Sequence, residues 1–468
     1  MRKYYAGLRT AAWLALAVWL RVSPGSAADA LVWRSDPDKV DAEIDSWPLP
    51  KVLEAISSAT GWQIYVEPDT QYTVTSRFHQ LKASEALRRL LGELNFALLP
   101  QTNGPARLFV YRDSVNAATQ LIQVAKKAKP DSGNNAIANE LIVRLKPGGK
   151  ESIEALAKRL GAKVVGRIDG LNAYRLQFED AAAAQSARAE LEGNNDVASV
   201  ENNYALAAPG QMQPLTLSPP TLSSFKLAPP SSTDKLIVAL VDTAVQSREA
   251  PWADYITDRI SLAGQATMDP NQLTHGTAMM DTLWDTLGKT LNDPGTASIG
   301  FLLIDPYGNN SSTTMFDVAN AIATAVNQGA KVINLSLAGL GESPLLEKTL
   351  EQAHNLGVLM VGAAGNDGGT AANLPAANPN VLSVTSIDRT GNLASYANRS
   401  SSVDLLARGT AVVYFNGQAY LITGTSTAAA NASGAATGLA VNNHLTPLEA
   451  SSKLTTLPGF APPKESKP

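Results

Sequence analysis

Short, near-continuous apolar runs alternate with helical patterns over the second half of the chain, and this alternation limits the fold more than any other feature. The runs are KLIVALVD, ASIGFLLID, KVINLSL, GVLMVGAAG and NVLSVTSI, and patterns such as TTMFDVANAIATAVNQG and PLLEKTLEQAHNLG lie between them. Strands that are apolar on both faces must be covered on both faces. The pattern therefore predicts an α/β fold, with a mostly parallel sheet and helices on both faces. In such a sheet, functional side chains gather at the carboxyl ends of the strands.

The chain contains no cysteine and only four histidines, which are His79, His275, His354 and His444. The absence of cysteine excludes disulfides, thiol nucleophiles, iron–sulfur clusters and Cys-ligated zinc. No two histidines are three or four residues apart, so we expect no histidine-based metal site and no other cofactor. The 38 basic and 42 acidic residues give a net charge of −4, so we also expect no nucleic acid partner.

Three residues supply the parts of a nucleophilic site. Asp242 ends the run KLIVALVD, His275 lies in LTHGTAMMDTL, and Ser426 precedes a helical stretch of small residues. Each alone is typical of a turn, a cap or an N-cap. Together they offer a nucleophile, a base to take its proton, and a carboxylate to orient that base. An α/β-hydrolase would need the order Ser, Asp, His, and Ala428 stands where its elbow glycine would be.

Five motifs in the same region resemble those of subtilisin-like serine peptidases, over residues of about 235–455. They are VALVDTAV, HGTAMMDTL, KVINLSLAG, VGAAGNDG and GTSTAAA, in the family's order. The resemblance implies that Asp242 orients the base, that His275 is the general base and then the acid, and that Ser426 is the nucleophile. It implies a polypeptide substrate and an endopeptidase activity.

The resemblance also assigns residues around the triad. Asn366 in AAGN matches the asparagine of the oxyanion hole. The segment that follows KVINL matches the edge that pairs with extended substrate, and it comprises Ser336, Leu337, Ala338 and Gly339. The glycine-rich stretch GAAGNDGG could instead belong to a nucleotide-binding loop, but it lacks the GxGxxG spacing and a Lys-Ser/Thr pair.

The sequence departs from the family pattern at several places. HGTAMMD lacks the second histidine and the following glycine, DTA replaces DTG, and Ala430 stands where proline is usual. None of these changes removes a proton-transfer group. The alternative function is a catalytically weak or inactive peptidase fold that acts as an interaction module. Structural calcium is expected only by family analogy, because no acidic run has EF-hand spacing.

Residues 1–30 have the order of a secretory signal peptide. Arg2 and Lys3 precede the apolar run 11–20, and small residues follow in SPGSAADA. An uncleaved anchor is the alternative, but this run is too short for the ~30 Å of bilayer hydrocarbon. The segment predicts export, to the periplasm or the medium of a Gram-negative-type bacterium.

Two small α+β units are predicted before the peptidase-like region. Residues 45–115 resemble the short N-terminal domain of secretins and TonB-dependent receptors, with LKASEALRRLLGELNF as the clearest match. That resemblance implies a periplasmic or outer-membrane protein partner, and a generic βαβ-type module is the alternative. Residues 136–206 read as βαββαβ, a ferredoxin-like order.

The second unit also resembles the inhibitory propeptide that precedes subtilisin-like catalytic domains. ELIVRLKPG, GLNAYRLQF and VASVENNYAL carry that resemblance, which implies a zymogen that binds its own propeptide. A Pro-rich linker over 207–233 is a plausible cleavage region. The peptidase domain is expected over 234–456, and a disordered tail over 457–468.

Overall fold

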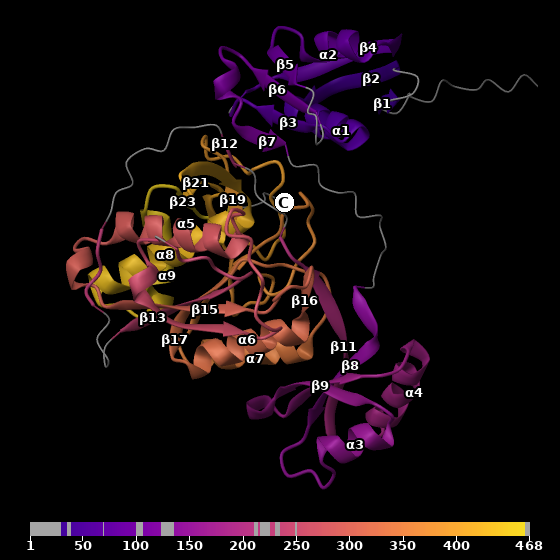
Figure 1. Cartoon of the computed structure of the whole chain (residues 1–468), viewed down its shortest axis with the longest axis vertical. Helices are drawn as coiled ribbons and strands as arrows, with labels where there is room; N and C mark the ends of the chain where they lie inside the picture. The colour runs from indigo at the N-terminus through magenta and orange to yellow at the C-terminus, as the bar shows by residue number, and fades with distance from the viewer. Residues whose placement is uncertain are drawn as a thin grey trace, which may run out of the picture.

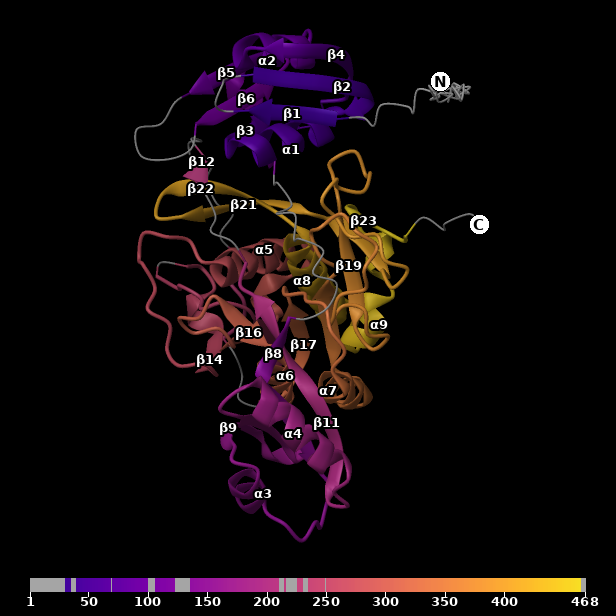
Figure 2. The ribbon, with the colours of Figure 1, turned by 90° about the vertical axis from the view of Figure 1, so that its right-hand side faces the viewer.

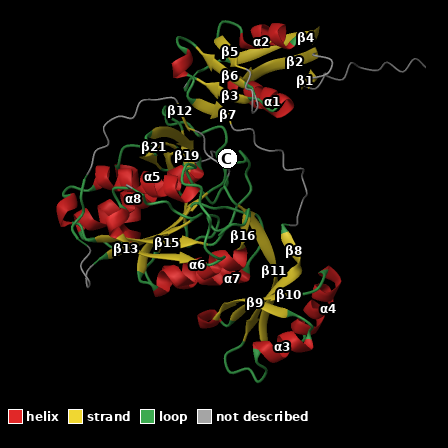
Figure 3. Cartoon of the chain, in the orientation of Figure 1, coloured by secondary structure: helices red, strands yellow, loops and turns green. Residues whose placement is uncertain are grey.

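The computed structural model of the chain describes residues 30–34, 39–68, 70–99, 106–122, 135–209, 214–215, 225–229, 235–248 and 250–463. Three units follow one another along the sequence, and the largest lies between the other two (Figure 1). All three combine helices with sheets (Figure 3). The predicted signal peptide lies outside the described residues, except for its last residue.

An eight-stranded sheet forms the centre of the largest unit, in the order β14-β15-β13-β17-β18-β19-β20-β23. Every neighbouring pair is parallel except β20 with β23. The predicted fold class, an α/β sheet preceded by two small α+β units, is therefore confirmed. The strands are β13 (Leu236–Val241), β14 (Ile256–Ser261), β15 (Ile299–Asp305), β17 (Ala330–Leu335), β18 (Leu359–Ala363), β19 (Leu382–Ile387), β20 (Leu405–Arg408) and β23 (Phe460–Ala461).

Helices cover both faces of this sheet (Figure 1). One face carries α5 (His275–Thr290) and α8 (Thr425–Asn443), and the other carries α6 (Met315–Asn327) and α7 (Pro344–Asn355). Successive residues of β13 explain the apolar runs. Val238 lies in the core beneath α5, whereas Ala239 lies in the core beneath α6. The short helix α9 (Pro447–Ser451) follows α8.

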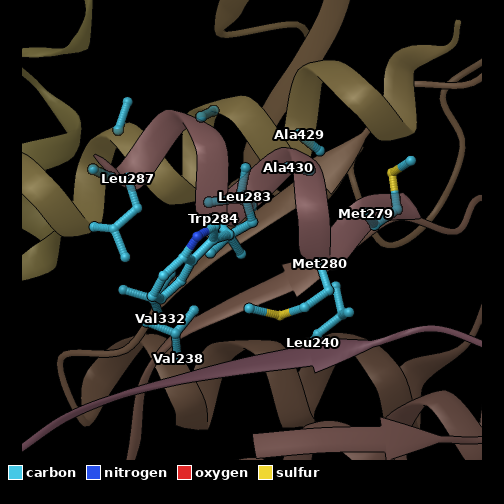
Figure 4. Close-up of a cluster of buried hydrophobic side chains, with 14 of the residues drawn as sticks. Val238, Leu240, Met279, Met280, Leu283, Trp284, Leu287, Val332, Ala429 and Ala430 are labelled. Carbon is cyan, nitrogen blue, oxygen red and sulfur yellow. The ribbon is translucent and has the colours of Figure 1, made fainter. Parts of the chain in front are cut away.

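The small residues of α8 allow α5 to pack closely against it (Figure 4). A Cβ atom on Gly434 would lie 2.4 Å from the Leu283 carbonyl oxygen, and one on Gly438 would lie 2.7 Å from Thr290. The contacts advance in the same direction along both helices, so α5 and α8 run parallel. Their N-terminal ends, at His275 and Ser426, therefore lie at the same end of the helix pair.

The predicted disordered tail over 457–468 is wrong for its first residues. Phe460 and Ala461 form β23, which pairs antiparallel with β20, and Phe460 packs on the core. Part of the predicted linker over 207–233 packs on the peptidase unit. Phe225 stacks on Trp284 with ring centroids 4.1 Å apart, and Leu227 is buried. In both segments, apolar side chains that lie near prolines in the sequence pack against the peptidase unit.

A hairpin that the sequence did not reveal precedes Ser426. It consists of β21 (Thr410–Phe415) and β22 (Gln418–Thr423), and β12 (Pro214–Leu215) pairs with the other side of β22. This small sheet lies between the rest of the peptidase unit and the N-terminal unit (Figure 2).

The middle unit has the predicted βαββαβ order and the sheet order β11-β8-β10-β9. Ser152 and Asp180 cap its two helices, since each side chain accepts from a backbone N–H in the first turn. The elements are β8 (Ala136–Leu145), α3 (Ile153–Arg159), β9 (Lys163–Ile168), β10 (Ala173–Gln177), α4 (Ala181–Glu192) and β11 (Val197–Ala207).

The N-terminal unit is larger than the predicted 45–115, because strands at both of its ends lie outside that range. It has two sheets, in the orders β1-β2-β4 and β5-β6-β3-β7. Its helix α1 ends at Thr60, and the C-cap Gly61 has a left-handed conformation with φ of 72°. The elements are β1 (Ala30–Arg34), β2 (Lys39–Pro48), α1 (Leu49–Thr60), β3 (Gln63–Val66), β4 (Thr73–Leu81), α2 (Ala83–Leu91), β5 (Asn95–Leu99), β6 (Arg107–Tyr111) and β7 (Gln120–Ile122).

Within the described part of the chain, no helix is long and apolar enough to cross a membrane.

Candidate active site

Asp242 and His275 form a close, buried pair. The Nδ1 atom of His275 lies 2.7 Å and 2.9 Å from the two carboxylate oxygens of Asp242. The Asp242 side chain is 2% exposed and the His275 side chain is 9% exposed. A carboxylate at this distance fixes the proton on Nδ1, which leaves Nε2 free to accept a proton.

The glycine after His275 brings the two residues together. Asp242 follows β13, and His275 is the first residue of α5, whose N-cap is Thr274. A Cβ atom on Gly276 would lie 2.0 Å from the Thr243 carbonyl oxygen, so only glycine allows this approach. The Gly276 N–H also donates to the Thr243 hydroxyl at 2.9 Å. The glycine of the His-Gly-Thr sequence is therefore required by the close approach of α5 to the backbone after β13.

Ser426 is the second residue of α8, at the helix end that it shares with His275. Its hydroxyl donates to the Ser336 carbonyl oxygen at 3.3 Å. Among the described residues, Ser426 and His275 make no hydrogen bond with each other. In enzymes without bound substrate, catalytic hydrogen bonds are often long or poorly aligned and shorten only when substrate binds.

A buried hydrogen-bond chain, which the sequence analysis missed, holds the start of α8 against β17. The Ser433 hydroxyl donates to Asn334 Oδ1 at 3.0 Å, and Asn334 Nδ2 donates to the Ser336 hydroxyl at 2.7 Å. That hydroxyl donates in turn to the Ser426 carbonyl oxygen at 3.1 Å. Asn334 is a polar residue among the buried apolar residues Val332, Ile333 and Leu335 of β17, which is the signal that could have revealed it.

Asn366 contacts Thr425, the residue that precedes Ser426. Its Oδ1 atom accepts from the Thr425 backbone N–H at 2.8 Å and from the Thr425 hydroxyl at 3.0 Å. Both acceptor contacts fix the orientation of the amide, so the Nδ2 donor points away from Thr425. Since Asn366 is exposed, that donor is accessible to a ligand next to Ser426.

The segment 336–339 is divided between core and surface. Ser336 and Leu337 are buried, while Gly339 forms two backbone hydrogen bonds of 2.9 Å with Leu374. The Gly339 backbone meets the middle unit, because a Cβ atom there would lie 2.9 Å from Leu206. The predicted substrate edge is thus covered by a residue of β11.

β11 also pairs antiparallel with β16 (Ser312–Thr314) on the peptidase unit. Ala205, Leu206 and Ala207 lie opposite these three residues, and the Ala208 N–H donates to the Ser311 carbonyl oxygen at 2.8 Å. The last strand of the middle unit therefore contacts both β16, which lies beside it in Figure 1, and Gly339 of the segment 336–339.

Two residues of β11 cap helices of the peptidase unit. The Glu201 carboxylate accepts from the Ser343 hydroxyl at 2.8 Å and from the Leu345 N–H at 3.0 Å, at the start of α7. Asn203 accepts from the Phe316 N–H at 3.3 Å, at the start of α6. Both residues are buried, so they satisfy helix donors that this interface removes from water.

Burial raises the pKa of Glu201 to about 7. The hydrogen bonds from Ser343 and Leu345 act against this shift, as does Arg144, while the Glu347 carboxylate adds to it. A second, partly buried contact between the units is the ion pair of Arg175 with Asp317, at 2.8 Å.

Comparisons with known proteins agree with this geometry. Residues 233–456 match the subtilase family, and residues 122–203 match the fervidolysin N-terminal prodomain. Thermitase of Thermoactinomyces vulgaris is 34% identical over 202 residues, which are 42% of this chain and 72% of thermitase. The chain therefore belongs to the subtilase family of serine peptidases and carries a prodomain of the fervidolysin type.

Other relatives are matched over less of their length. A thermostable alkaline protease of Halalkalibacterium halodurans is 32% identical over 206 residues, 42% of this chain and 55% of that protein. A thermophilic serine proteinase of Bacillus sp. strain AK1 is 36% identical over 180 residues, 37% of this chain and 44% of that protein. The chain thus spans about half the length of these two relatives.

Among the described residues, no group of three or more His, Cys, Asp or Glu side chains could hold a metal ion. The described side chains therefore offer no carboxylate-rich calcium site, and structural calcium stays a prediction by analogy.

Proposed function

We propose that the chain is an exported serine endopeptidase, made as a zymogen, that hydrolyses peptide bonds through an acyl-enzyme. The contact of His275 Nδ1 with both Asp242 oxygens, at the helix end that also bears Ser426, carries this proposal. Its substrate is an extended polypeptide, since backbone pairing along β16 binds a strand without reading its sequence.

The reaction follows from the hydrogen-bonding capacity of each group. The Ser426 hydroxyl turns from the Ser336 carbonyl to His275 Nε2, gives up its proton, and attacks the peptide carbonyl carbon. Asp242 stabilises the imidazolium that forms. The Ser426 N–H and Asn366 Nδ2 donate to the oxyanion, and His275 then protonates the leaving amine. Water, deprotonated by His275, releases the acid and restores Ser426.

Replacing Asn366 by aspartate tests its role as an oxyanion donor. Aspartate keeps the acceptor oxygen that Thr425 uses but removes the Nδ2 donor. We expect kcat to fall by roughly 10²–10³, a magnitude known from this family and borrowed here, while KM changes little. Steady-state hydrolysis of a peptide substrate measures both constants. A rise in KM at unchanged kcat would instead mean that Asn366 contributes to substrate binding alone.

The prodomain inhibits the enzyme by occupying the substrate groove with β11. This role rests on the pairing of residues 205–207 with β16 and on the contact of Leu206 with Gly339. We expect the wild-type chain to cut itself between about 205 and 235, whereas the Ser426→Ala chain stays full-length. Mass spectrometry of the purified proteins tests this. Equal processing of both chains would exclude self-cleavage.

The protonation of Glu201 is expected to control how tightly the prodomain docks. Docking raises its pKa from 4.5 to about 7, so its contribution is complete below pH 4.5 and is lost as the pH rises through 7. The docking equilibrium should weaken by roughly 10²-fold across that range. Hydrogen-exchange protection of β16 in full-length Ser426→Ala protein, corrected for intrinsic exchange, measures it.

A matched pair of variants isolates this effect. Glu201→Gln resembles the protonated acid and should remove most of the pH dependence. Glu192→Gln changes an exposed residue of the same unit and should keep it. Equal pH dependence in all three proteins would contradict the assignment to Glu201.

The N-terminal unit completes the proposal. Its resemblance to the short domains of secretins and TonB-dependent receptors supports a role in binding a periplasmic or outer-membrane protein. The signal-peptide pattern of residues 1–30 supports export to the periplasm or the medium.

A further inference from the structure

The β21–β22 hairpin has an edge that already holds an extended segment. In the small sheet of order β12-β22-β21, Pro214 lies opposite Tyr420 and Leu215 lies opposite Ala419, in antiparallel register. Without β12, β22 would be an edge strand with unpaired backbone groups, which is a template for any extended chain.

The segment that pairs with this edge follows closely in the sequence after the residues that pair with β16. Residues 205–207 pair with β16, and residues 214–215 pair with β22, whose last residue, Thr423, precedes Ser426 by three positions. Two segments close together in the sequence, residues 205–207 and 214–215, therefore pair with β16 and with β22, and β22 leads into the helix that bears the candidate nucleophile. A polypeptide substrate runs in the same direction as these segments, because the same β16 pairing would orient it.

The hairpin is supported on the face that meets the N-terminal unit. Thr410, Val412 and Leu421 line a cavity there together with Pro68 and Gln120. A two-stranded ribbon is marginal by itself, and these contacts hold the hairpin in place beside the site.

We propose that the edge of β22 that β12 occupies in this structure is a binding site for the part of the substrate beyond the scissile bond. This inference rests on the proposed peptidase function. The site pairs with an extended backbone several residues after the cleaved bond, since antiparallel strands pair one residue to one residue. It gives the enzyme a preference for cleavage within extended chains over cleavage near a carboxyl end.

Peptide length tests the proposal on the processed enzyme. Two internally quenched peptides share all residues up to the scissile bond and continue for two or for six residues beyond it. We expect the longer peptide to have a kcat/KM on the order of tenfold higher, from two or three added backbone hydrogen bonds. If the enzyme hydrolyses neither peptide, that result would overturn both the proposed function and this inference.

A variant ensures that the enzyme's own segment does not hide the effect. In the Pro214→Gly/Leu215→Gly protein, two glycines weaken the tethered strand at the edge. A gain from the longer peptide in this variant supports the proposal, whether or not the wild type shows it. Equal kcat/KM for both peptides in this variant would overturn the inference while leaving the peptidase function intact.

N-methylation of the substrate backbone supplies the matched control. In an antiparallel pair, only alternate residues direct their N–H groups toward the partner strand. Two forms of the longer peptide carry N-methyl groups on alternate sets of the amides that the shorter peptide lacks. One form should lose the tenfold gain and the other should keep it. Equal behaviour of the two forms would contradict strand pairing.

Discussion

Replacing Ser426 by alanine is expected to lower kcat for peptide hydrolysis by about 10⁶ while leaving the fold unchanged. The hydroxyl is the group that would attack the substrate, whereas the neighbouring hydroxyls of Thr425 and Ser336 donate to Asn366 Oδ1 and to the Ser426 carbonyl oxygen. Within the described part of the chain, the only hydrogen bond of the Ser426 hydroxyl is the 3.3 Å contact with the Ser336 carbonyl oxygen, so little stability is lost with it. The buried chain that holds the start of α8 uses the Ser426 carbonyl, which alanine keeps.

Steady-state hydrolysis and thermal unfolding, measured on the same preparations, check this prediction. Ser401→Ala changes an exposed serine of the same unit and should retain wild-type activity. Residual activity of Ser426→Ala within tenfold of the wild type would assign the nucleophile to another group.

Replacing Asp242 by asparagine is expected to lower kcat by about 10⁴, the second largest effect. The asparagine amide can donate to His275 Nδ1, which places the ring proton on Nε2. In that tautomer the ring cannot accept a proton from Ser426. Asparagine keeps an oxygen that can accept from the Thr243 N–H, a bond of 2.7 Å in this structure. The fold should therefore survive.

If the loss comes from the tautomer of His275, replacing a carboxylate that does not contact His275 should not lower kcat. Asp254→Asn changes an exposed carboxylate of the peptidase unit and should leave kcat unchanged. Comparable losses in the Asp242 and Asp254 variants would point to a general electrostatic effect instead of a tautomer effect.

The sequence was sufficient to predict the sheet and the proximity of Asp242 and His275, while the roles of the three triad residues stay a prediction. Strands such as β13 are apolar on both faces, so they could be recognised without knowing their neighbours. Asp242 and His275 stand out because they lie at a strand end and a helix start, next to residues with tight-turn chemistry. The subtilase and prodomain resemblances predicted from five motifs and three stretches are confirmed by the family matches.

Features that depend on contacts between distant segments could not be predicted. Glu201 looks like an ordinary strand residue until α7 is placed against it. The hairpin of β21 and β22 has polar and aromatic residues without a clear period, and its packing against the N-terminal unit is a tertiary effect. Phe460 lies in a Pro-rich tail, and only the edge of β20 gives it a strand conformation.

The most direct test of the central claim is labelling of Ser426 by a fluorophosphonate probe. Such a probe reacts with a serine that a neighbouring base activates. In processed, prodomain-free protein we predict labelling at Ser426, and its loss in both the Ser426→Ala and the His275→Ala proteins. Correctly folded, prodomain-free protein that takes up no label would contradict the peptidase account and favour an inactive interaction module.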